Sequence, residues 1–256
     1  MNSFRDLFSA HAADYERYRP VYPPALFDWL AKVAPDRKVA WDCGTGSGQA
    51  AIGLASHFGR VIATDASEKQ LAHAVPSHGI SYRVASAEVP GLAAASIDLA
   101  TVAQAFHWFD AGAFFRAAAE VLVPRGVLAL WTYRNSRVDA AVDAVERDFY
   151  VNVVGQDWAG PRRLVEEGYA SVRFPPPFEE MSAPRFELSA SWTRDEFLGY
   201  VGTWSAVHAH RKRTGTDPLA PFASRITAAW SGSEMREVRG VLALRVARKV
   251  TSRATA

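Results

Sequence analysis

A glycine-rich loop between a strand and a helix constrains this sequence more than any other feature. The loop reads Asp-Cys-Gly-Thr-Gly-Ser-Gly over residues 42–48, after a β-rich run that starts at Val39 and before a helical pattern that extends to about His57. Alternate glycines let the backbone turn sharply, and the start of the following helix offers N–H groups that have no partner within the helix. Together these features predict a site for a nucleotide-like ligand.

The glycine spacing separates two classes of nucleotide-binding protein. The dinucleotide fingerprint is G-x-G-x-x-G, and counted from Gly44 its third glycine would fall on Gln49, so the chain does not match the NAD enzymes. Asp65 ends the next strand, where an acid in a doubly wound fold accepts hydrogen bonds from a ribose diol, and Ala66 leaves space beside it. The alternative interpretation is that Asp65 only precedes the helix cap Ser67.

Short β-rich runs alternate with helical patterns from Lys38 to Trp131, which is typical of a parallel sheet wound by right-handed crossovers. We expect an α/β fold with a doubly wound, mostly parallel, seven-stranded Rossmann-like sheet. The expected strands are residues 39–43, 60–65, 81–86, 97–103, 126–132, 186–191 and 238–246. The expected helices are residues 4–15, 24–33, 48–57, 67–75, 111–122, 137–154, 162–169 and 193–207, the last opened by the capping box Thr193-x-x-Glu196.

Three further stretches continue the strand-and-loop pattern that begins with the glycine loop and Asp65. Ile97-Asp98-Leu99 fits a fourth strand, residues 104–110 (QAFHWFD) fit the loop after it, and residues 120–128 (EVLVPRGVL) fit a turn into a fifth strand. Over about residues 10–132 the chain resembles the class I S-adenosylmethionine-dependent methyltransferases. The HWFD stretch and the leading Tyr15-x-x-x-Arg19-Pro20-x-Tyr22-Pro23 resemble more particularly the branch of trans-aconitate methyltransferase-like enzymes, which act on small molecules.

The resemblance implies S-adenosylmethionine as the cofactor and a set of residues that hold it. Where the family often has Asp-Ala after the third strand, this chain has Ser86-Ala87-Glu88, so the adenine amine is expected to meet Ser86 or only the backbone. Arg19 is a candidate partner of the methionine carboxylate, and the alternative is a solvated helix end. The full cofactor set is Asp42, Gly44, Thr45, Gly46, Gly48, Asp65, Ala66, Ser86, Ala87, Glu88, Gln104, Tyr15 and Arg19.

Residues after the fourth strand are the candidates for chemistry, because ligands bind at the carboxyl edge of open α/β sheets. His107 is the candidate catalytic residue, as a base or to orient the acceptor, and the alternative is that it packs within its loop. No metal is expected. The candidate acceptor residues are Tyr22, Trp108, Arg134 and Trp204, although core packing is the favoured alternative for Trp204. Arginines 134, 137, 162 and 163 suit a carboxylate or phenolate, and surface solvation is their alternative role.

We expect one methyltransferase domain over residues 1–256. Residues 1–37 are expected to form cover helices, residues 38–133 the cofactor-binding core, and residues 134–185 a helical insertion. This insertion, which contains the linker Pro175-Pro176-Pro177, is too long for a plain connection and is expected to act as a cap. Residues 186–256 would supply the strands and helices that complete the sheet.

Composition and the absence of certain motifs narrow the range of molecules that could accept the methyl group. The net charge is +2, so nucleic-acid binding gains little from charge, and the segment after the fourth strand lacks the D/N-P-P-Y motif of amino-directed DNA enzymes. The only cysteine, Cys43, lies in the glycine loop, which also disfavours cytosine-C5 chemistry and suits a reducing cytoplasm. No signal peptide or membrane span is expected. A small-molecule acceptor is therefore preferred, and the alternatives are an RNA or protein acceptor, or a cofactor-binding regulatory protein without turnover. The sequence leaves the oligomeric state open.

Overall fold

Parallel strands form the larger half of the sheet. The computed structural model describes residues 20–133, 136–232 and 234–250. The strand order is β3-β2-β1-β4-β5-β8-β6, with β7 also paired to β8, so the expected α/β fold with a mostly parallel sheet is confirmed. The five parallel strands are β1 (Val39–Cys43), β2 (Arg60–Asp65), β3 (Ile80–Val84), β4 (Ile97–Ala103) and β5 (Leu122–Tyr133).

Among the residues that the structure describes, the sheet has eight strands rather than the expected seven. β8 (Met235–Lys249) runs antiparallel to β5 and is longer than the expected 238–246. Its other edge pairs with β6 (Phe178–Met181) near its end and with β7 (Phe186–Thr193) near its beginning. The sequence prediction placed no strand at residues 178–181, which follow the linker 175–177, because four residues are too few to show an alternating pattern. Pairing with the extra length of β8 makes them a strand.

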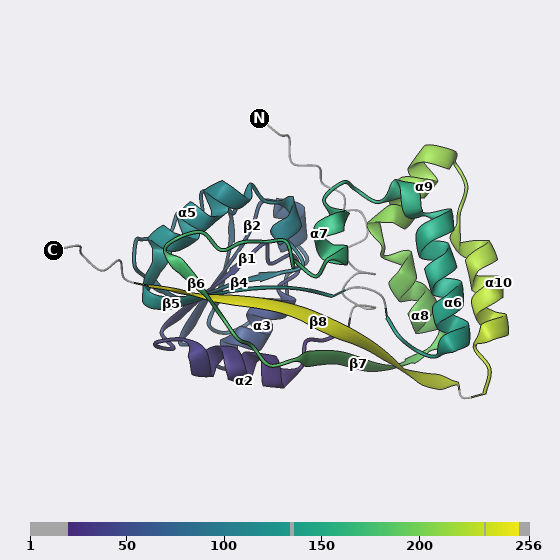
Figure 1. The fold of residues 1–256 in the computed structure, drawn as a ribbon, viewed down its shortest axis with the longest axis horizontal. Coiled ribbons are helices and arrows are strands. Elements are labelled where there is room, and N and C mark those ends of the chain that lie inside the picture. Colours follow the sequence, from purple (N-terminus) through teal and green to yellow (C-terminus); the bar gives the residue numbers. More distant parts are fainter. Residues whose placement is uncertain (1–19, 134–135, 233, 251–256) are drawn as a thin grey trace.

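Helices pack on both faces of the sheet. In Figure 1, α2 (Pro24–Val33) and α3 (Gln49–Ala55) lie on one face, while α5 (Ala111–Val121) lies on the other. Each face has its own buried hydrophobic cluster, as parallel strands covered on both sides require. α4 (Glu68–Leu71) is one turn capped by the Ser67 hydroxyl and is shorter than the expected helix 67–75.

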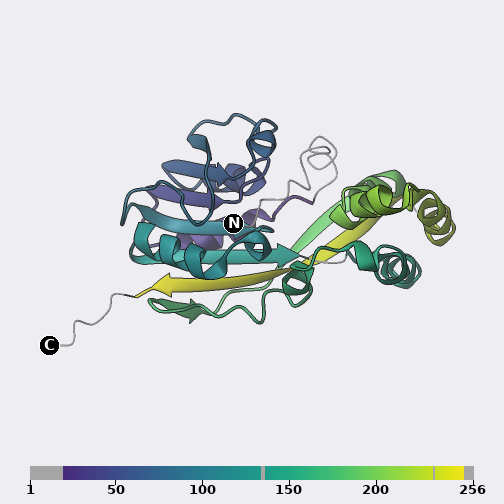
Figure 2. The same ribbon diagram turned by 90° about the horizontal axis from the view of Figure 1, so that it is seen from above.

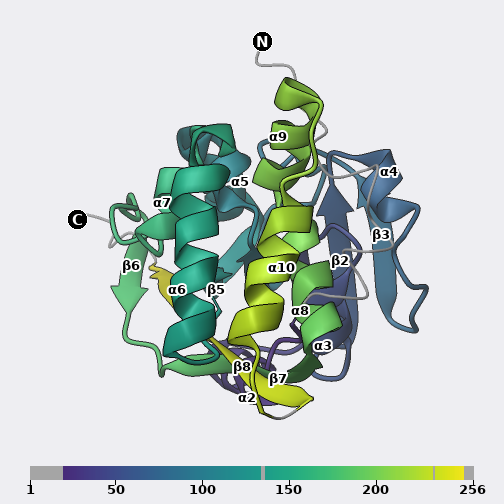
Figure 3. The same cartoon turned by 90° about the vertical axis from the view of Figure 1, so that its right-hand side faces the viewer.

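A helical cap lies beyond the carboxyl ends of the parallel strands (Figures 1 and 3). Its first part follows β5, and its second part connects β7 to β8. We define the cap as α6 (Ala140–Asp148), the π-helical turn η3 (Phe149–Val153), the short turn η4 (Gly155–Asp157), α7 (Arg162–Glu166), α8 (Arg194–Gly202), α9 (Ser205–Thr214) and α10 (Leu219–Ala229). Figure 2 shows the β7–β8 ribbon leaving the rest of the sheet to reach these helices.

The second part of the cap differs from the sequence prediction. The capping box is confirmed, since the Thr193 hydroxyl accepts from the Glu196 N–H and the Glu196 carboxylate accepts from the Thr193 N–H. The expected single helix 193–207 is wrong, because the chain leaves helical geometry at Trp204 and starts again as α9. The sequence prediction also missed α10, whose buried Phe222 ring lies 4.3 Å from that of Phe149 in the first part.

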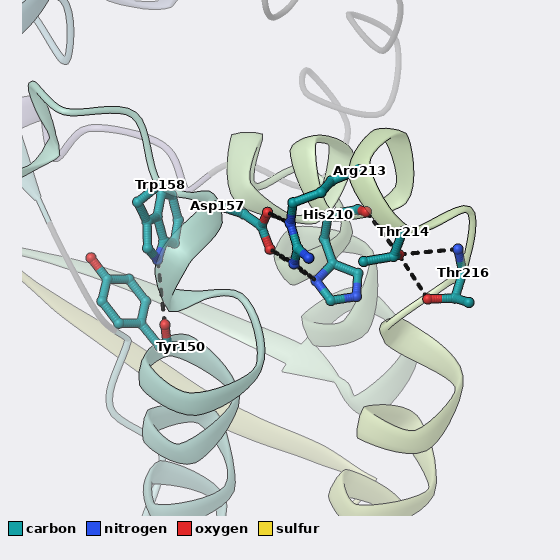
Figure 4. Close-up of polar contacts among 7 residues, drawn as sticks. All are labelled: Tyr150, Asp157, Trp158, His210, Arg213, Thr214 and Thr216. Atoms are coloured by element: carbon teal, nitrogen blue, oxygen red, sulfur yellow. Dashed lines mark hydrogen bonds and ion pairs between the residues drawn. The ribbon is translucent and has the colours of Figure 1, made fainter.

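The first part of the cap begins later than expected. Arg137 pairs with Arg239 in an isolated β-bridge, and α6 then starts after its cap Asp139. The two parts are joined by polar contacts of the Asp157 carboxylate. It pairs with the Arg213 guanidinium at 2.6 Å and with His210 Nδ1 at 2.9 Å (Figure 4). Within the described ranges no helix has the length and apolar character needed to cross a bilayer.

Candidate active site

Each of the three loop glycines adopts a left-handed backbone conformation, with φ of 68° at Gly44, 57° at Gly46 and 92° at Gly48. A Cβ at Gly44 would lie 2.6 Å from the Ala105 Cβ, and one at Gly48 would lie 2.3 Å from the Tyr82 hydroxyl. A Cβ at Gly46 would meet only a glutamine side-chain oxygen at 3.8 Å. The outer two glycines therefore permit close packing, whereas Gly46 leaves an open cradle that a ligand can approach.

Asp65 connects the loop to the end of β2. Its Oδ2 accepts the Gly46 N–H at 2.9 Å, and its Oδ1 accepts the Ser67 N–H at 2.9 Å. A carboxylate has about four acceptor positions, so these two bonds are compatible with further bonds from a ribose diol. Both sequence interpretations of Asp65 are therefore compatible with the geometry, because the carboxylate lies beside the glycine cradle and also precedes the Ser67 cap.

Asp42 lies beneath the loop rather than at its surface. Its side chain is fully buried and accepts the hydroxyls of Thr45 at 2.6 Å and Thr101 at 2.8 Å. Burial raises the pKa of the Asp42 carboxyl to about 6, while the two hydroxyls oppose this shift. In this arrangement Asp42 positions Thr45, which belongs to the predicted cofactor set, from below.

The strand order brings most of the predicted cofactor residues to one edge of the sheet. β3, β2, β1 and β4 are neighbours, and residues 86–88, 65–66, 44–48 and 104 lie at or just after their carboxyl ends. Ala66 is exposed, Ala87 is buried, and the Ser86 hydroxyl accepts the Val89 N–H at 3.2 Å. Glu88 accepts the Asp110 N–H at 3.0 Å and so contacts the loop after β4. Tyr15 and Arg19 lie outside the described residues.

Gln104 adopts a strained backbone conformation where β4 ends, with φ of 56°. Its side-chain amide bridges to β5, donating to the Tyr133 carbonyl at 3.0 Å and accepting the Thr132 hydroxyl at 2.5 Å. These bonds fix the direction in which the loop leaves β4, and that loop carries His107.

His107 lies in the short turn η2 (Phe106–Trp108), with Nδ1 3.1 Å from the Tyr169 hydroxyl. Burial lowers the pKa of the imidazole to about 3, and the positive charge of Arg162 adds to this shift. His107 is therefore neutral at physiological pH. Tyr169 is fully buried, and burial raises the pKa of its phenol above the usual range, so the hydroxyl stays protonated.

The structure separates the predicted acceptor residues. Trp108 is 36% exposed beside His107, with their ring centroids 4.9 Å apart. Tyr22 is 5% exposed and packs edge-on against Trp131 at 5.5 Å. Trp204 is equally buried inside the cap, where its ring lies 5.7 Å from that of Tyr150, an environment that fits the core-packing alternative. Arg134 lies outside the described residues.

Sequence reasoning missed three polar residues of this site. The Thr101 hydroxyl donates a hydrogen bond to Asp42, and the Thr132 hydroxyl donates one to Gln104. The Tyr169 hydroxyl contacts His107. Thr101 and Thr132 lie within apolar strand patterns, and Tyr169 was expected at the end of a helix. Their roles depend on partners 59, 28 and 62 positions away, so no local pattern identifies them.

The fold and the site together define a Rossmann-like protein that binds a nucleotide-like cofactor at the carboxyl edge of its sheet. The methyltransferase domain family matches residues 41–130. A solved protein of Anaeromyxobacter dehalogenans, assigned as a type II methyltransferase, is 47% identical, covers 91% of this chain and 99% of its own, and superposes with a TM-score of 0.84. A protein assigned as a methyltransferase in Dictyostelium discoideum is 29% identical over 90% of this chain and 89% of its own length.

The chain therefore belongs to the class I S-adenosylmethionine-dependent methyltransferases, as its motifs predict. It is an enzyme of that family, and S-adenosylmethionine is its cofactor. The open cradle at Gly46 and the carboxylate of Asp65 beside it fit the close approach and the ribose diol of this cofactor.

Proposed function

We propose that this enzyme methylates a small molecule that carries a carboxylate or a phenol. The observation that carries the proposal is a cavity of about 1100 Å³ between α6, α7 and β8. The cavity reaches Thr132, which binds Gln104 at the carboxyl edge of the sheet. Its volume lies slightly above the usual range of small-molecule sites, which is about 300–1,000 Å³.

Different residues of the chain would bind the cofactor and align the acceptor. When bound, S-adenosylmethionine supplies a methyl group on a positively charged sulfur. Gly46 and Asp65 would hold its adenosine part, and Ser86 or the neighbouring backbone would meet its adenine. The cap would exclude water and align the acceptor for in-line attack, and such alignment lowers the barrier of a transfer reaction. The cover expected from residues 1–37 stays a prediction, because residues 1–19 lie outside the described part of the chain and α2 packs on one face of the sheet.

The lowered pKa of His107 bears on which acceptor group the site suits. A base works best when its pKa lies near the working pH, so an imidazole whose pKa is about 3 removes a phenol proton poorly. A carboxylate is already ionised near neutral pH and needs only to be oriented. We therefore favour a carboxylate as the methylated group, with His107 orienting it.

The remaining parts of the proposal follow from charge and cysteine content. The net charge of +2 disfavours a nucleic-acid acceptor. The single cysteine, Cys43, is buried, and a chain without disulfides suits a reducing cytoplasm. The trans-aconitate methyltransferase-like branch remains the subfamily we propose.

The test is turnover by the purified full chain with S-adenosylmethionine and a panel of small acids, phenols and amines, read as S-adenosylhomocysteine by mass spectrometry. We expect product with acids and little with amines. Binding of the cofactor without product from any acceptor would instead indicate a regulatory protein. Turnover of RNA or protein alone would overturn the small-molecule proposal.

A further inference from the structure

Arg162 at the start of α7 is held by two aromatic side chains of the cap. Its guanidinium carbon lies 4.2 Å from the centroid of the Trp158 ring and 5.5 Å from that of Tyr150. Its Nε donates to the Tyr150 hydroxyl at 2.9 Å. The two rings lie 4.8 Å apart, and Figure 4 shows them side by side. The guanidinium is therefore fixed in direction by stacking and by one hydrogen bond.

The fixed guanidinium has no carboxylate partner within the described parts of the chain. Glu166, one turn along α7, accepts a hydrogen bond from the Tyr150 hydroxyl at 2.8 Å. Asp157 pairs with Arg213 and His210. The side-chain hydrogen bond of Arg162 to a described residue uses Nε, which leaves its two terminal nitrogens for another acceptor. A half-buried positive charge that no described carboxylate pairs with costs free energy, so the arrangement favours an anionic ligand.

Arg162 begins α7, a helix that contacts the turn η2 where His107 lies. Its charge adds to the lowering of the His107 pKa and opposes the raising of the Tyr169 pKa by burial, which requires that it lie within electrostatic reach of that pair. The neighbouring Arg163 differs in each respect, because it is exposed and pairs with Glu167 at 2.6 Å. Of these two adjacent arginines, only Arg162 combines fixed geometry with proximity to His107.

We propose that Arg162 determines specificity by binding a carboxylate of the acceptor through its two terminal nitrogens. A planar guanidinium matches a carboxylate with two parallel hydrogen bonds, and stacking on Trp158 preserves that plane. The role of Tyr150 is to position Arg162 through its Nε. This inference deepens the proposed function, since it rests on a small-molecule acceptor and adds that the acceptor is an acid.

The test measures binding separately from turnover. The full-length protein is loaded with S-adenosylhomocysteine and titrated calorimetrically with benzoate, 4-hydroxybenzoate and cinnamate, each paired with its uncharged methyl ester. We expect at least one acid to bind at least tenfold more tightly than its ester. Arg162→Met is expected to remove that preference, Arg162→Lys to restore part of it, and the matched control Arg163→Met to leave it unchanged.

Each outcome decides the inference. It is overturned if no acid binds better than its ester, if Arg162→Met keeps the preference, or if Arg163→Met loses it to the same extent. The proposed function is judged separately by the formation of S-adenosylhomocysteine in turnover. Arg162-dependent acid binding without turnover would refute the proposed function alone, while turnover of neutral phenols that is insensitive to Arg162→Met would refute the inference alone.

Discussion

The hydroxyl of Tyr169 lies 3.1 Å from Nδ1 of His107, although the two residues are 62 positions apart in the sequence. The Tyr169 ring also packs edge-on against Phe106, the neighbour of His107, at 5.6 Å. Tyr169 is thus a positioning residue for an imidazole that stands where β4 ends, and it links the first part of the cap to the reacting edge.

Removing that hydroxyl is expected to lower the rate more than the affinity. A hydrogen bond of this kind contributes about 0.5–1.5 kcal/mol, so Tyr169→Phe should reduce kcat about two- to tenfold with little change in KM. Steady-state kinetics with an acceptor identified by the turnover panel would measure this. A rise in KM at constant kcat, or a normal kcat, would argue against positioning, and thermal unfolding would confirm that the variant is folded.

The pH dependence of the reaction separates the two acceptor chemistries. Because the pKa of His107 is about 3, the imidazole stays neutral between pH 6 and 8, and a carboxylate acceptor is ionised over the same range. We expect kcat to be nearly flat in this window for the wild type. His107→Ala should lower it modestly without changing the profile. An activity that rises with pH near neutrality and depends on His107 would instead indicate a base acting on a phenol.

Glu146 gives the stability of the protein a pH dependence of its own. The carboxyl is 2% exposed, contacts the Ser136 hydroxyl at 3.0 Å, and has its pKa raised to about 8 by burial. The folded state therefore keeps a proton that the unfolded chain releases near pH 4.5. The stabilising contribution of this proton is complete below about pH 4.5 and is lost as the pH rises to about 8.

Glu146→Gln tests this dependence, because the amide cannot lose a proton. Urea unfolding at pH 5 and pH 8 should show that the wild type loses more stability than the variant between the two values, by a few kcal/mol. The exposed Glu234→Gln serves as the control and should behave as the wild type. Equal losses in the wild type and in Glu146→Gln would show that Glu146 does not carry the effect.

A comparison of Gly48 with Gly79 distinguishes the effect of a steric clash in the glycine loop from the effect of the left-handed backbone conformation. Both have a left-handed conformation, with φ of 92° and 82°, but a Cβ at Gly48 would meet the Tyr82 hydroxyl at 2.3 Å while one at Gly79 meets nothing within 4 Å. Gly48→Ala should therefore destabilise the protein more than Gly79→Ala, whose cost is about 1 kcal/mol from the backbone alone. Equal changes in urea midpoint would contradict the packing role assigned to Gly48.

The parts of the fold that sequence could predict are those with local patterns. β1, β2, β4 and α2 have the expected bounds because their hydrophobic runs are bordered by clear turn and capping residues. β6 exists only through pairing with β8, and the cap depends on packing between helices more than 70 residues apart, such as Phe149 on Phe222. Likewise, the spacing of its glycines was enough to predict the glycine loop, whereas the contact between Tyr169 and His107 could be found only in the tertiary structure.

The most direct test of the account is the calorimetric affinity of the full chain for S-adenosylmethionine, compared between the wild type and Asp65→Ala. Losing hydrogen bonds to a charged acceptor costs about 1.5–3 kcal/mol, so the dissociation constant should rise about ten- to a hundredfold. Asp36→Ala, which removes an exposed acid paired with Lys38 outside the site, should bind as the wild type does. An unchanged affinity in folded Asp65→Ala, or no binding by the wild type, would contradict the assignment of the glycine loop and Asp65 as the cofactor site.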